Sequence, residues 1–283
     1  MALPNFLIIG APKAGSTSLY HYVGQHPEVF TSAVKEPGFF RTYRSQGTIA
    51  NREDYEELFR GSEKYKAVGE GSPVYLSDEN APKRIKDLIP DAKLIAILRD
   101  PYERAFSQFV FLRLRGQEPE TAFLAAVHGD IARPAPQRSN YVEQGLYHRS
   151  LTRYLSHFED HQMKVVLLDD LEVRPDEVVS EVFSFLEVDS SVKVDTTDKL
   201  TQSGVARLKP LHWLLSDRNP VKRTLAPRLP VAAKKAFRRI RASNLERQTM
   251  SRADRRALAP FFEDDIERLE KLLGRDLRSW RAG

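Results

Sequence analysis

The 283-residue sequence predicts a three-layer α/β fold in which a central parallel sheet is flanked by helices. Three short runs, residues 5–10, 93–98 and 164–168, are apolar at nearly every position. Strands of a parallel sheet are buried on both faces and therefore lack the polar alternation of a half-exposed strand. Each run is followed by a segment with helical spacing, which is the alternation expected of such a sheet.

Three helices are predicted after these strands. Residues 16–25 open from a glycine-containing turn, residues 102–114 begin after Pro101, and residues 176–186 carry valine and phenylalanine at helical spacing. In the second of these helices the apolar face is formed by Ala105, Phe106, Phe109 and Leu112. Helices in these places would connect successive strands of one parallel sheet.

Residues 251–273 predict a long helix in a basic C-terminal part of the fold. Ser251 and Asp254 form a capping pair, and Gly274 is a typical residue after a helix end. The apolar stripe consists of Phe262, Ile266, Leu269 and Leu273. Such a stripe predicts that the helix packs on the rest of the protein.

Two regions lack regular patterning. Residues 118–144 have weak periodicity and contain the breaker RPAPQ, so we expect a surface excursion. Residues 216–231 contain three prolines and predict a poorly ordered basic connection. We expect one domain over residues 1–283, in which 205–250 is a basic, partly irregular segment and 251–283 packs as a C-terminal helix.

Composition excludes several kinds of site. The sequence contains no cysteine, so disulfides, thiolate metal sites and cysteine nucleophiles are excluded. The N-terminal apolar stretch covers only residues 6–9, which is too short for a secretory signal or a membrane span. We therefore expect a cytoplasmic protein without a transmembrane segment.

The net charge of +5 is unevenly spread along the chain. Residues 207–256 hold 15 Lys and Arg against three acids, a balance of +12 that leaves about −7 for the remainder. This asymmetry fits an anionic partner near the C-terminal third, such as an anionic acceptor or a membrane surface. It fits a solvated helical surface equally well. A non-catalytic polyanion-binding module therefore stays open as one interpretation of the chain.

The most informative segment is FLIIGAPKAGSTSL, residues 6–19. A buried strand runs into a turn and then a helix, whose unpaired first N–H groups and dipole favour an anion. Gly15 allows the backbone to approach a phosphate closely, and Lys13 adds a positive charge. Three hydroxyl side chains follow: Ser16, Thr17 and Ser18. The segment predicts a phosphate-binding loop and a P-loop-like fold.

The loop departs from the Walker A pattern, G-x-x-x-x-G-K-[ST], at one position. Gly10, Gly15 and Thr17 fill their places, but Ser16 stands where the lysine belongs, and the lysine has moved back to Lys13. In a nucleotide kinase that lysine and Mg²⁺ offset the charge of the β- and γ-phosphates. The loop therefore predicts a 5′-phosphate site of another kind, without a metal. A P-loop kinase remains the alternative, since VVLLDD imitates a Walker B strand.

The second informative segment is LRDPYERAFSQF, residues 98–109. Arg99 directly follows a buried strand and therefore lies at the carboxyl edge of the sheet, where open α/β sheets bind ligands. Ser107 lies in the following helix and could face the same anion, since an arginine and a hydroxyl make a phosphate pocket. The alternative is an ordinary ion pair of Arg99 with Asp100 or Glu103.

Together the two segments resemble the signature elements of sulfotransferases that use 3′-phosphoadenosine-5′-phosphosulfate (PAPS). The likeness is greatest to the heparan-sulfate type and to bacterial members. It extends through five further segments: KEPGFF (35–40), GEGSPVYL (69–76), GLYHRSLTRYL (145–155), SGVARLK (203–209) and the final LGRDLRSW.

The resemblance implies transfer of a sulfuryl group from PAPS to a hydroxyl or amine of an acceptor, such as a carbohydrate. The product is then adenosine 3′,5′-bisphosphate, and neither a metal nor a nucleic-acid partner is expected. The resemblance assigns the 5′-phosphosulfate to Lys13, Ala14, Gly15, Ser16, Thr17 and Ser18. It assigns the 3′-phosphate to Arg99 and Ser107, and a late loop that closes over the nucleotide to Ser203, Gly204 and Arg207.

The resemblance also implies catalytic roles. Glu36 matches the acidic residue that takes the acceptor's proton, and Lys13 is the cation at the leaving oxygen. We expect Phe39 and Phe40 to bury the turn that holds Glu36 and so to raise its basicity. A simple ion pair of Glu36 with Lys35 or Arg41 is the alternative.

Three further residues are candidates for a base or for substrate contacts: His148, Lys35 and Glu70. His148 is a second candidate base, because imidazole titrates near neutrality. Glu70 could pair with Lys13 or with an acceptor group. Gly38 and Gly71 depart from the family pattern, because many relatives have histidine at the first position and the heparan-sulfate enzymes have lysine at the second.

Overall fold

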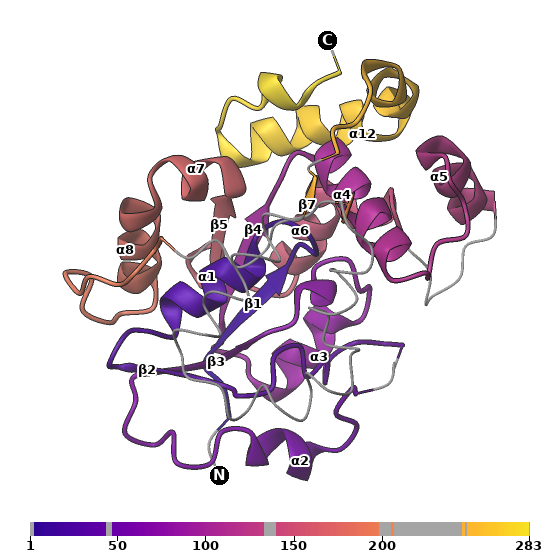
Figure 1. The fold of residues 1–283 in the computed structure, drawn as a ribbon. Coiled ribbons are helices and arrows are strands. Elements are labelled where there is room, and N and C mark those ends of the chain that lie inside the picture. Colours follow the sequence, from indigo (N-terminus) through magenta and orange to yellow (C-terminus); the bar gives the residue numbers. More distant parts are fainter. Residues whose placement is uncertain are drawn as a thin grey trace.

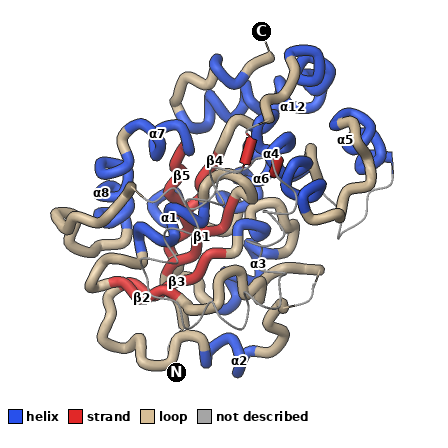
Figure 2. The backbone as a smooth tube through the Cα atoms, viewed as in Figure 1, coloured by secondary structure: helices blue, strands red, loops and turns tan. Residues whose placement is uncertain are grey.

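A computed structural model describes residues 3–43, 47–132, 140–197, 205–206, 245–246 and 248–282. In these residues five parallel strands form the central sheet, in the order β2-β3-β1-β4-β5 (Figures 1 and 2). The bounds are β1 Phe6–Gly10, β2 Val29–Thr31, β3 Ala67–Gly71, β4 Lys93–Leu98 and β5 Met163–Leu167. The predicted α/β fold with a central parallel sheet is therefore confirmed.

β1 lies in the middle of the sheet and pairs in parallel with β3 and β4. Ile8 pairs with Gly71 on one side and with Ile95 on the other. Because these strands run in the same direction, their carboxyl ends meet at one edge, and the segments that follow them lie there together. Every residue of β1 is buried, as expected of a strand that is covered on both faces.

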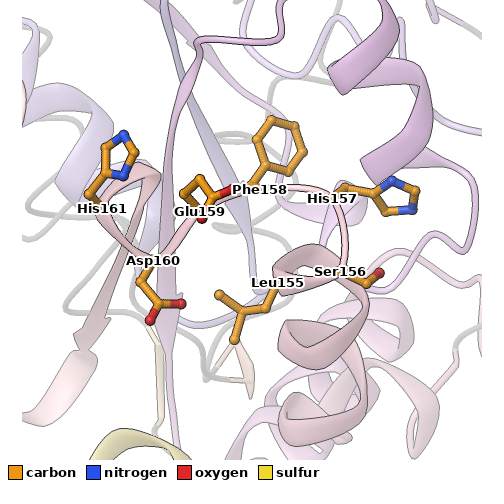
Figure 3. A pocket seen from close by; sticks show the side chains of 7 residues that line it. All are labelled: Leu155, Ser156, His157, Phe158, Glu159, Asp160 and His161. Atoms are coloured by element: carbon orange, nitrogen blue, oxygen red, sulfur yellow. The ribbon is translucent and has the colours of Figure 1, made fainter.

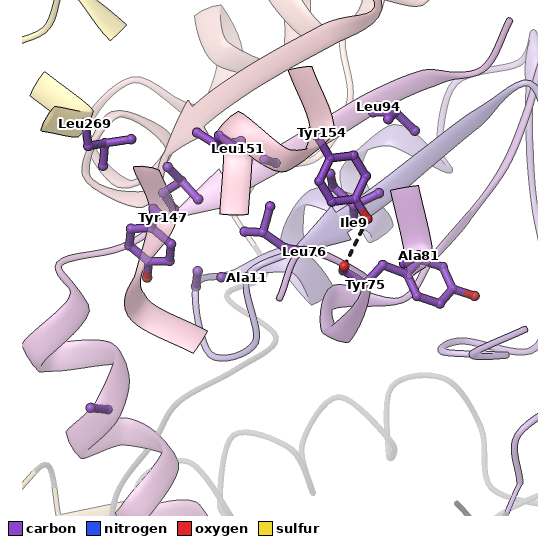
Figure 4. Close-up of a cluster of buried hydrophobic side chains, with 14 of the residues drawn as sticks. Ile9, Ala11, Tyr75, Leu76, Ala81, Leu94, Tyr147, Leu151, Tyr154 and Leu269 are labelled. Atoms are coloured by element: carbon purple, nitrogen blue, oxygen red, sulfur yellow. Dashed lines mark hydrogen bonds between the residues drawn. The ribbon is translucent and has the colours of Figure 1, made fainter. Parts of the chain in front are cut away.

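Helices cover both faces of the sheet (Figure 1). Their bounds are α1 Ser16–Val23, α2 Arg52–Glu57, α3 Ala81–Leu88, α4 Pro101–Leu114, α5 Phe123–Ala132, α6 Tyr147–Leu155, α7 Leu168–Val173, α8 Pro175–Phe185 and α12 Arg252–Leu273. Short 3₁₀ turns span Pro73–Tyr75, Glu143–Gly145, Asp160–Gln162 and Arg278–Trp280, and β6 Val205–Ala206 pairs with β7 Leu245–Glu246. α1 and α8 pack on one face, where Val182 shares a buried cluster with Ile8. α3, α4 and α6 cover the other, where Leu151 and Leu269 are buried with Ile9, and α12 packs on α4 and α6 (Figure 4).

α12 confirms the predicted C-terminal helix. At its start Ser251 Oγ accepts a hydrogen bond from the N–H of Asp254, and Gly274 ends it with a left-handed φ of 59°. The Tyr102 hydroxyl of α4 donates to Glu263 Oε1 of α12 over 2.8 Å. The C-terminal helix is therefore fastened to the helix that follows β4.

Two expectations about regular structure need correction. The surface excursion expected at residues 118–144 contains a helix, α5, because Phe123 and Val127 find a buried surface there. The sequence did not predict β3, since its residues AVGEG include two glycines and a glutamate, which are uncommon in strands. A Cβ at Gly69 would lie 2.5 Å from the ring of Phe6, so close packing against β1 requires glycine at that position.

The remaining predicted strands and helices are confirmed to within two residues at each end. Residues 216–231, predicted to be an irregular connection, lie outside the described residues, as does most of the basic segment 205–250. In the part of the chain that the structure describes, none of the helices has the length and apolar character needed to cross a membrane.

Candidate active site

The turn between β1 and α1 is held in one conformation by its packing. Gly15 caps the start of α1 with a φ of 91°, and a Cβ there would lie 2.7 Å from Leu168 Cδ1. Lys13 also has a left-handed φ of 67°. Ala11 and Ala14 are fully buried beneath it. Such a turn requires small residues where the backbone bends and leaves its polar groups facing outward.

The start of α1 presents backbone donors that can hold an anion. The N–H of Ser18 bonds to the carbonyl of Gly15 over 3.0 Å, which begins the helix. Among the described residues, the N–H groups of Gly15, Ser16 and Thr17 meet no acceptor. Because they lie at the positive end of the helix dipole, these groups are suited to hold an anion.

Arg99 follows β4 and reaches back to this loop. Its Nη1 donates to the carbonyl of Lys13 over 3.3 Å, and its Nη2 lies 3.3 Å from Glu103 Oε2. The Tyr147 hydroxyl donates to the carbonyl of Arg99 over 2.8 Å, and only 16% of the arginine side chain is exposed. The ion pair with Glu103 is thus present, yet the same guanidinium also contacts the phosphate loop. Ser107 is buried further along α4.

Asp100 fixes the start of α4. Its Oδ1 accepts hydrogen bonds from the N–H groups of Tyr102 (2.9 Å) and Glu103 (3.2 Å). Its Oδ2 pairs with Arg255 of α12 over 2.8 Å, and the same guanidinium donates to the carbonyl of Trp280 over 2.6 Å. Asp100 therefore pairs with the C-terminal helix and not with the arginine that precedes it.

Lys13 lies among other cations. Its Nζ is 4.0 Å from the centre of the Phe111 ring, and the guanidinium of Arg115 is 4.3 Å from the same ring. Burial and, to a smaller extent, the charges of Arg99 and Arg115 together lower the pKa of Lys13 to about 8, against the opposing charge of Glu36. This arrangement favours an incoming anion, which would offset the repulsion between the cations.

Glu36 lies in the turn at residues 35–40, beside the carboxyl end of β3. Its N–H donates to the carbonyl of Gly71 over 3.1 Å. Its Oε1 forms an ion pair with Lys35 Nζ over 2.7 Å, and half of its side chain is exposed. The ion pair that the sequence offered as the alternative is therefore present, and the carboxylate still faces solvent.

The expected burial of the Glu36 carboxylate is wrong. Phe39 stacks on Tyr55 with ring centres 4.3 Å apart, and Phe40 is buried against Tyr75. Both rings therefore pack into the interior, while the carboxylate stays 50% exposed on the other side of the turn.

Glu70 is fully buried on β3, and its partners are tyrosines. The Tyr75 hydroxyl donates to Glu70 Oε1 over 2.8 Å, and the Tyr55 hydroxyl lies 3.4 Å from the same atom. Burial raises the pKa of Glu70 to about 7. The pairing with Lys13 that the sequence left open is not what the structure contains.

His148 lies at the start of α6, against α12. Its N–H donates to Asp265 Oδ2 over 3.0 Å, and among the described residues it has no contact with Lys13, Arg99 or Glu36. The late-loop residues Ser203, Gly204 and Arg207 lie outside the described residues.

The comparison with family models decides the family. The model described as "Sulfotransferase domain" matches residues 3–221. The chain belongs to this sulfotransferase family.

Among solved structures, this sulfotransferase is similar to a sulfotransferase from Alicyclobacillus acidocaldarius, with a TM-score of 0.76 and 28% identity over 99% of both chains. It is 29% identical over 194 residues to the bifunctional heparan sulfate N-deacetylase/N-sulfotransferase 1 of Caenorhabditis elegans, covering 66% of this chain and 22% of that protein. It is 27% identical over 295 residues to carbohydrate sulfotransferase 15 of Mus musculus, covering 82% of this chain and 50% of that protein. The chain thus spans half or less of these two curated relatives.

The two aspartates of VVLLDD in this sulfotransferase are engaged by the C-terminal segment. Asp169 Oδ2 accepts a hydrogen bond from Trp280 Nε1 over 3.1 Å. Asp170 pairs with Arg275 over 3.0 Å and with Arg174 over 3.6 Å. The resemblance to a Walker B strand is therefore explained by structural contacts, which disfavours the kinase alternative.

Residues 155–161 line a hollow, and Figure 3 shows their side chains. It borders the amino end of β5, whereas the phosphate loop, Arg99 and Glu36 follow carboxyl ends. The hollow is therefore not part of the candidate active site.

Sequence reasoning missed Phe111 and Tyr75. Phe111 lies off the predicted apolar face of α4, and this placement is the one signal that could have marked it as a site residue. Tyr75 follows β3, a strand that the sequence did not predict.

Proposed function

We propose that this sulfotransferase transfers a sulfuryl group from PAPS to a hydroxyl or amine of an acceptor. The contact of Arg99 with the carbonyl of Lys13 carries the proposal, because it brings two anion-binding elements together. One element is the set of free N–H donors at the start of α1, and the other is the guanidinium at the end of β4. The likeness to a sulfotransferase over 99% of the chain supports it.

The two ends of the nucleotide would meet different donors. The 5′-phosphosulfate would accept hydrogen bonds from the backbone N–H groups of Gly15, Ser16 and Thr17 and from the hydroxyls of the last two. The 3′-phosphate would lie on Arg99 and Ser107, since a guanidinium binds phosphate through paired donors.

The reaction requires a proton acceptor and a cation. Glu36 would take the proton of the acceptor's hydroxyl or amine while that atom forms its bond to sulfur. The bond between sulfur and the bridging oxygen breaks, and its electron pair stays on the 5′-phosphate of adenosine 3′,5′-bisphosphate. Lys13 would offset the charge that develops on this oxygen.

A carbohydrate is the acceptor class that we propose. It is supported by the names of two relatives, which refer to heparan sulfate and to carbohydrate. The half-exposed Glu36 and its partner Lys35 would meet the acceptor at the solvent side of the turn.

Calorimetric titration with adenosine 3′,5′-bisphosphate and, separately, with ATP and Mg²⁺ tests the nucleotide class. We expect tight binding of the bisphosphate, whereas binding of ATP–Mg²⁺ alone would contradict the proposal. A screen of carbohydrate acceptors with labelled PAPS then tests the acceptor. A polyanion-binding module would instead bind heparin with steep salt dependence, and this binding would survive Glu36→Gln and Lys13→Ala.

A further inference from the structure

The turn at residues 35–40 has a backbone that its own sequence does not favour. Glu36 has a φ of 62° and Gly38 a φ of 66°. The left-handed region suits glycine, but for a glutamate it costs on the order of 1–3 kcal/mol. Such a conformation persists only where neighbouring residues fix it. The contacts of the turn therefore show which residues hold the Glu36 side chain in its place.

Three backbone N–H groups tie the turn to the end of β3 and the 3₁₀ turn that follows. The N–H of Glu36 donates to the carbonyl of Gly71 over 3.1 Å. The N–H of Gly38 donates to Ser72 Oγ over 3.1 Å, and the N–H of Phe40 donates to the Tyr75 hydroxyl over 3.3 Å. Two of the three acceptors are side chains, so substitutions can remove them without changing the backbone.

The Tyr75 hydroxyl is itself oriented by Glu70. A tyrosine hydroxyl has one proton, and this one is donated to Glu70 Oε1 over 2.8 Å. The oxygen lone pairs are thereby turned toward the N–H of Phe40. Hydrogen bonds in such a chain strengthen one another, most of all when the final acceptor is charged.

Core packing does not account for Glu70. The residue is fully buried, and its Oε2 has no hydrogen-bond partner among the described residues. Burying a carboxyl group in this state is costly, and an apolar residue would fill the same volume without that cost. Its contact with Tyr75, and through Tyr75 with the turn, is what an apolar residue could not supply.

We propose that Glu70 is a positioning residue for Glu36: by orienting the Tyr75 hydroxyl, it holds the turn at residues 35–40 in the conformation that presents the base. The proposal rests on the proposed function, in which Glu36 takes the acceptor's proton. Glu70 would act without touching the acceptor or the nucleotide.

The test compares Tyr75→Phe with Tyr154→Phe. Tyr154 is an equally buried tyrosine whose hydroxyl donates to the carbonyl of Tyr75 over 2.9 Å (Figure 4). Its loss removes a buried hydroxyl of the same kind but no acceptor of the turn. We expect Tyr75→Phe to speed hydrogen exchange of the Phe40 amide about 10-fold, the cost of one hydrogen bond. We expect kcat to fall about 10-fold or more through misplacement of the base. The KM for PAPS and the affinity for bisphosphate should not change.

Substitution of Glu70 itself gives a graded second test. Glu70→Leu should lower kcat like Tyr75→Phe, because the hydroxyl of Tyr75 loses its acceptor. Glu70→Gln should restore part of kcat, because its amide oxygen can accept the same hydrogen bond.

The proposal is overturned if Tyr75→Phe leaves kcat and the exchange of the Phe40 amide unchanged. It is also overturned if Tyr154→Phe lowers kcat equally, since Glu70 and Tyr75 would then serve general stability. If the wild-type protein transfers sulfuryl to no acceptor, the proposed function fails. Exchange of the Phe40 amide in Glu70→Leu would still decide whether Glu70 anchors the turn.

Discussion

Two tight turns lie at the carboxyl edge of the sheet, and they are held in place in different ways. The phosphate loop runs from buried β1 directly into α1, and it offers backbone N–H groups. The turn at residues 35–40 is attached to its neighbour through the side chains of Ser72 and Tyr75. In the proposed function, nucleotide binding would thus depend on the backbone of one turn, and proton transfer on side chains beneath the other. Substitutions should therefore separate the two functions.

The largest expected effect is at the second turn. Glu36→Gln keeps the shape of the side chain but removes its basicity, so turnover should fall by about 10²–10⁴-fold. Binding of adenosine 3′,5′-bisphosphate, measured by calorimetry, should stay near that of the wild type, because the hydrogen bonds of Glu36 in the described residues join it to Lys35 and Gly71 and not to the phosphate loop. His148→Ala is the control and should retain turnover. Full turnover in Glu36→Gln with loss in His148→Ala would make His148 the base.

The anchor of the second turn should give a pH-dependent stability. The pKa of Glu70 is raised from 4.5 to about 7 in the folded protein, so the folded state binds this proton more tightly than the unfolded state. The resulting stabilisation is complete below pH 4.5 and is lost as the pH rises to 7. The contribution amounts to about 3 kcal/mol at most. Denaturant unfolding of the wild type and Glu70→Gln across this range measures it. A constant difference in unfolding free energy between the two proteins would show that Glu70 does not titrate there.

A smaller effect is expected at the phosphate loop. Arg99→Ala removes a charge-assisted contact worth about 1.5–3 kcal/mol, so the affinity for bisphosphate should fall about 10- to 100-fold. Arg113→Ala, on the exposed side of the same helix, serves as the control because, within the described residues, its guanidinium donates to the carbonyls of Pro119 and Glu120. Equal affinity in the two variants would place the 3′-phosphate elsewhere. Arg207→Ala should weaken binding in the same way if the late loop closes on the nucleotide.

The smallest effect concerns protons at the phosphate loop. The pKa of Lys13 is lowered to about 8, and a bound anion should raise it again. Binding of bisphosphate above pH 8 should therefore take up protons, and the affinity should fall by at most about 10-fold per pH unit. Calorimetry in buffers of different ionisation enthalpy measures the uptake. Arg115→Gln removes a charge that lowers the pKa of Lys13, so proton uptake should begin at a higher pH than in the wild type. If proton uptake begins at the same pH in both proteins, Arg115 does not lower the pKa of Lys13.

The parts of the fold that the sequence predicted are those whose signal is local. β1, β4 and β5 are apolar at nearly every position, and all of β1, residues 94–98 of β4 and the last two residues of β5 are buried. The sequence did not predict β3, because its glycines are required by contacts with residues far away in the sequence. A Cβ at Gly69 would meet the ring of Phe6, and a Cβ at Gly71 would meet the ring of Tyr20. No periodicity within five residues can encode such contacts.

The candidate site divides in the same way. Lys13, Gly15 and Arg99 were predicted because each lies in a motif that is one unbroken stretch of sequence. In the structure the guanidinium of Arg99 contacts the carbonyl of Lys13. The contacts of Phe111 with Lys13 and of Tyr75 with Phe40 join residues more than 30 positions apart. The exposure of Glu36 was mispredicted for a related reason: its aromatic neighbours turn inward to pack on α2 and the 3₁₀ turn.

The pairing of Asp100 with Arg255 bears on how far this protein can be shortened. The match to the family model ends at residue 221, yet the carboxylate that caps the helix after Arg99 is neutralised from α12. A protein trimmed to the matched region would keep every residue of the phosphate loop and lose that counter-charge. Asp100 would then lose its ion-pair partner beside Arg99, the arginine that we propose as the ligand of the 3′-phosphate. Minimal versions for engineering should therefore retain the helix at Arg252–Leu273 and the carbonyl of Trp280.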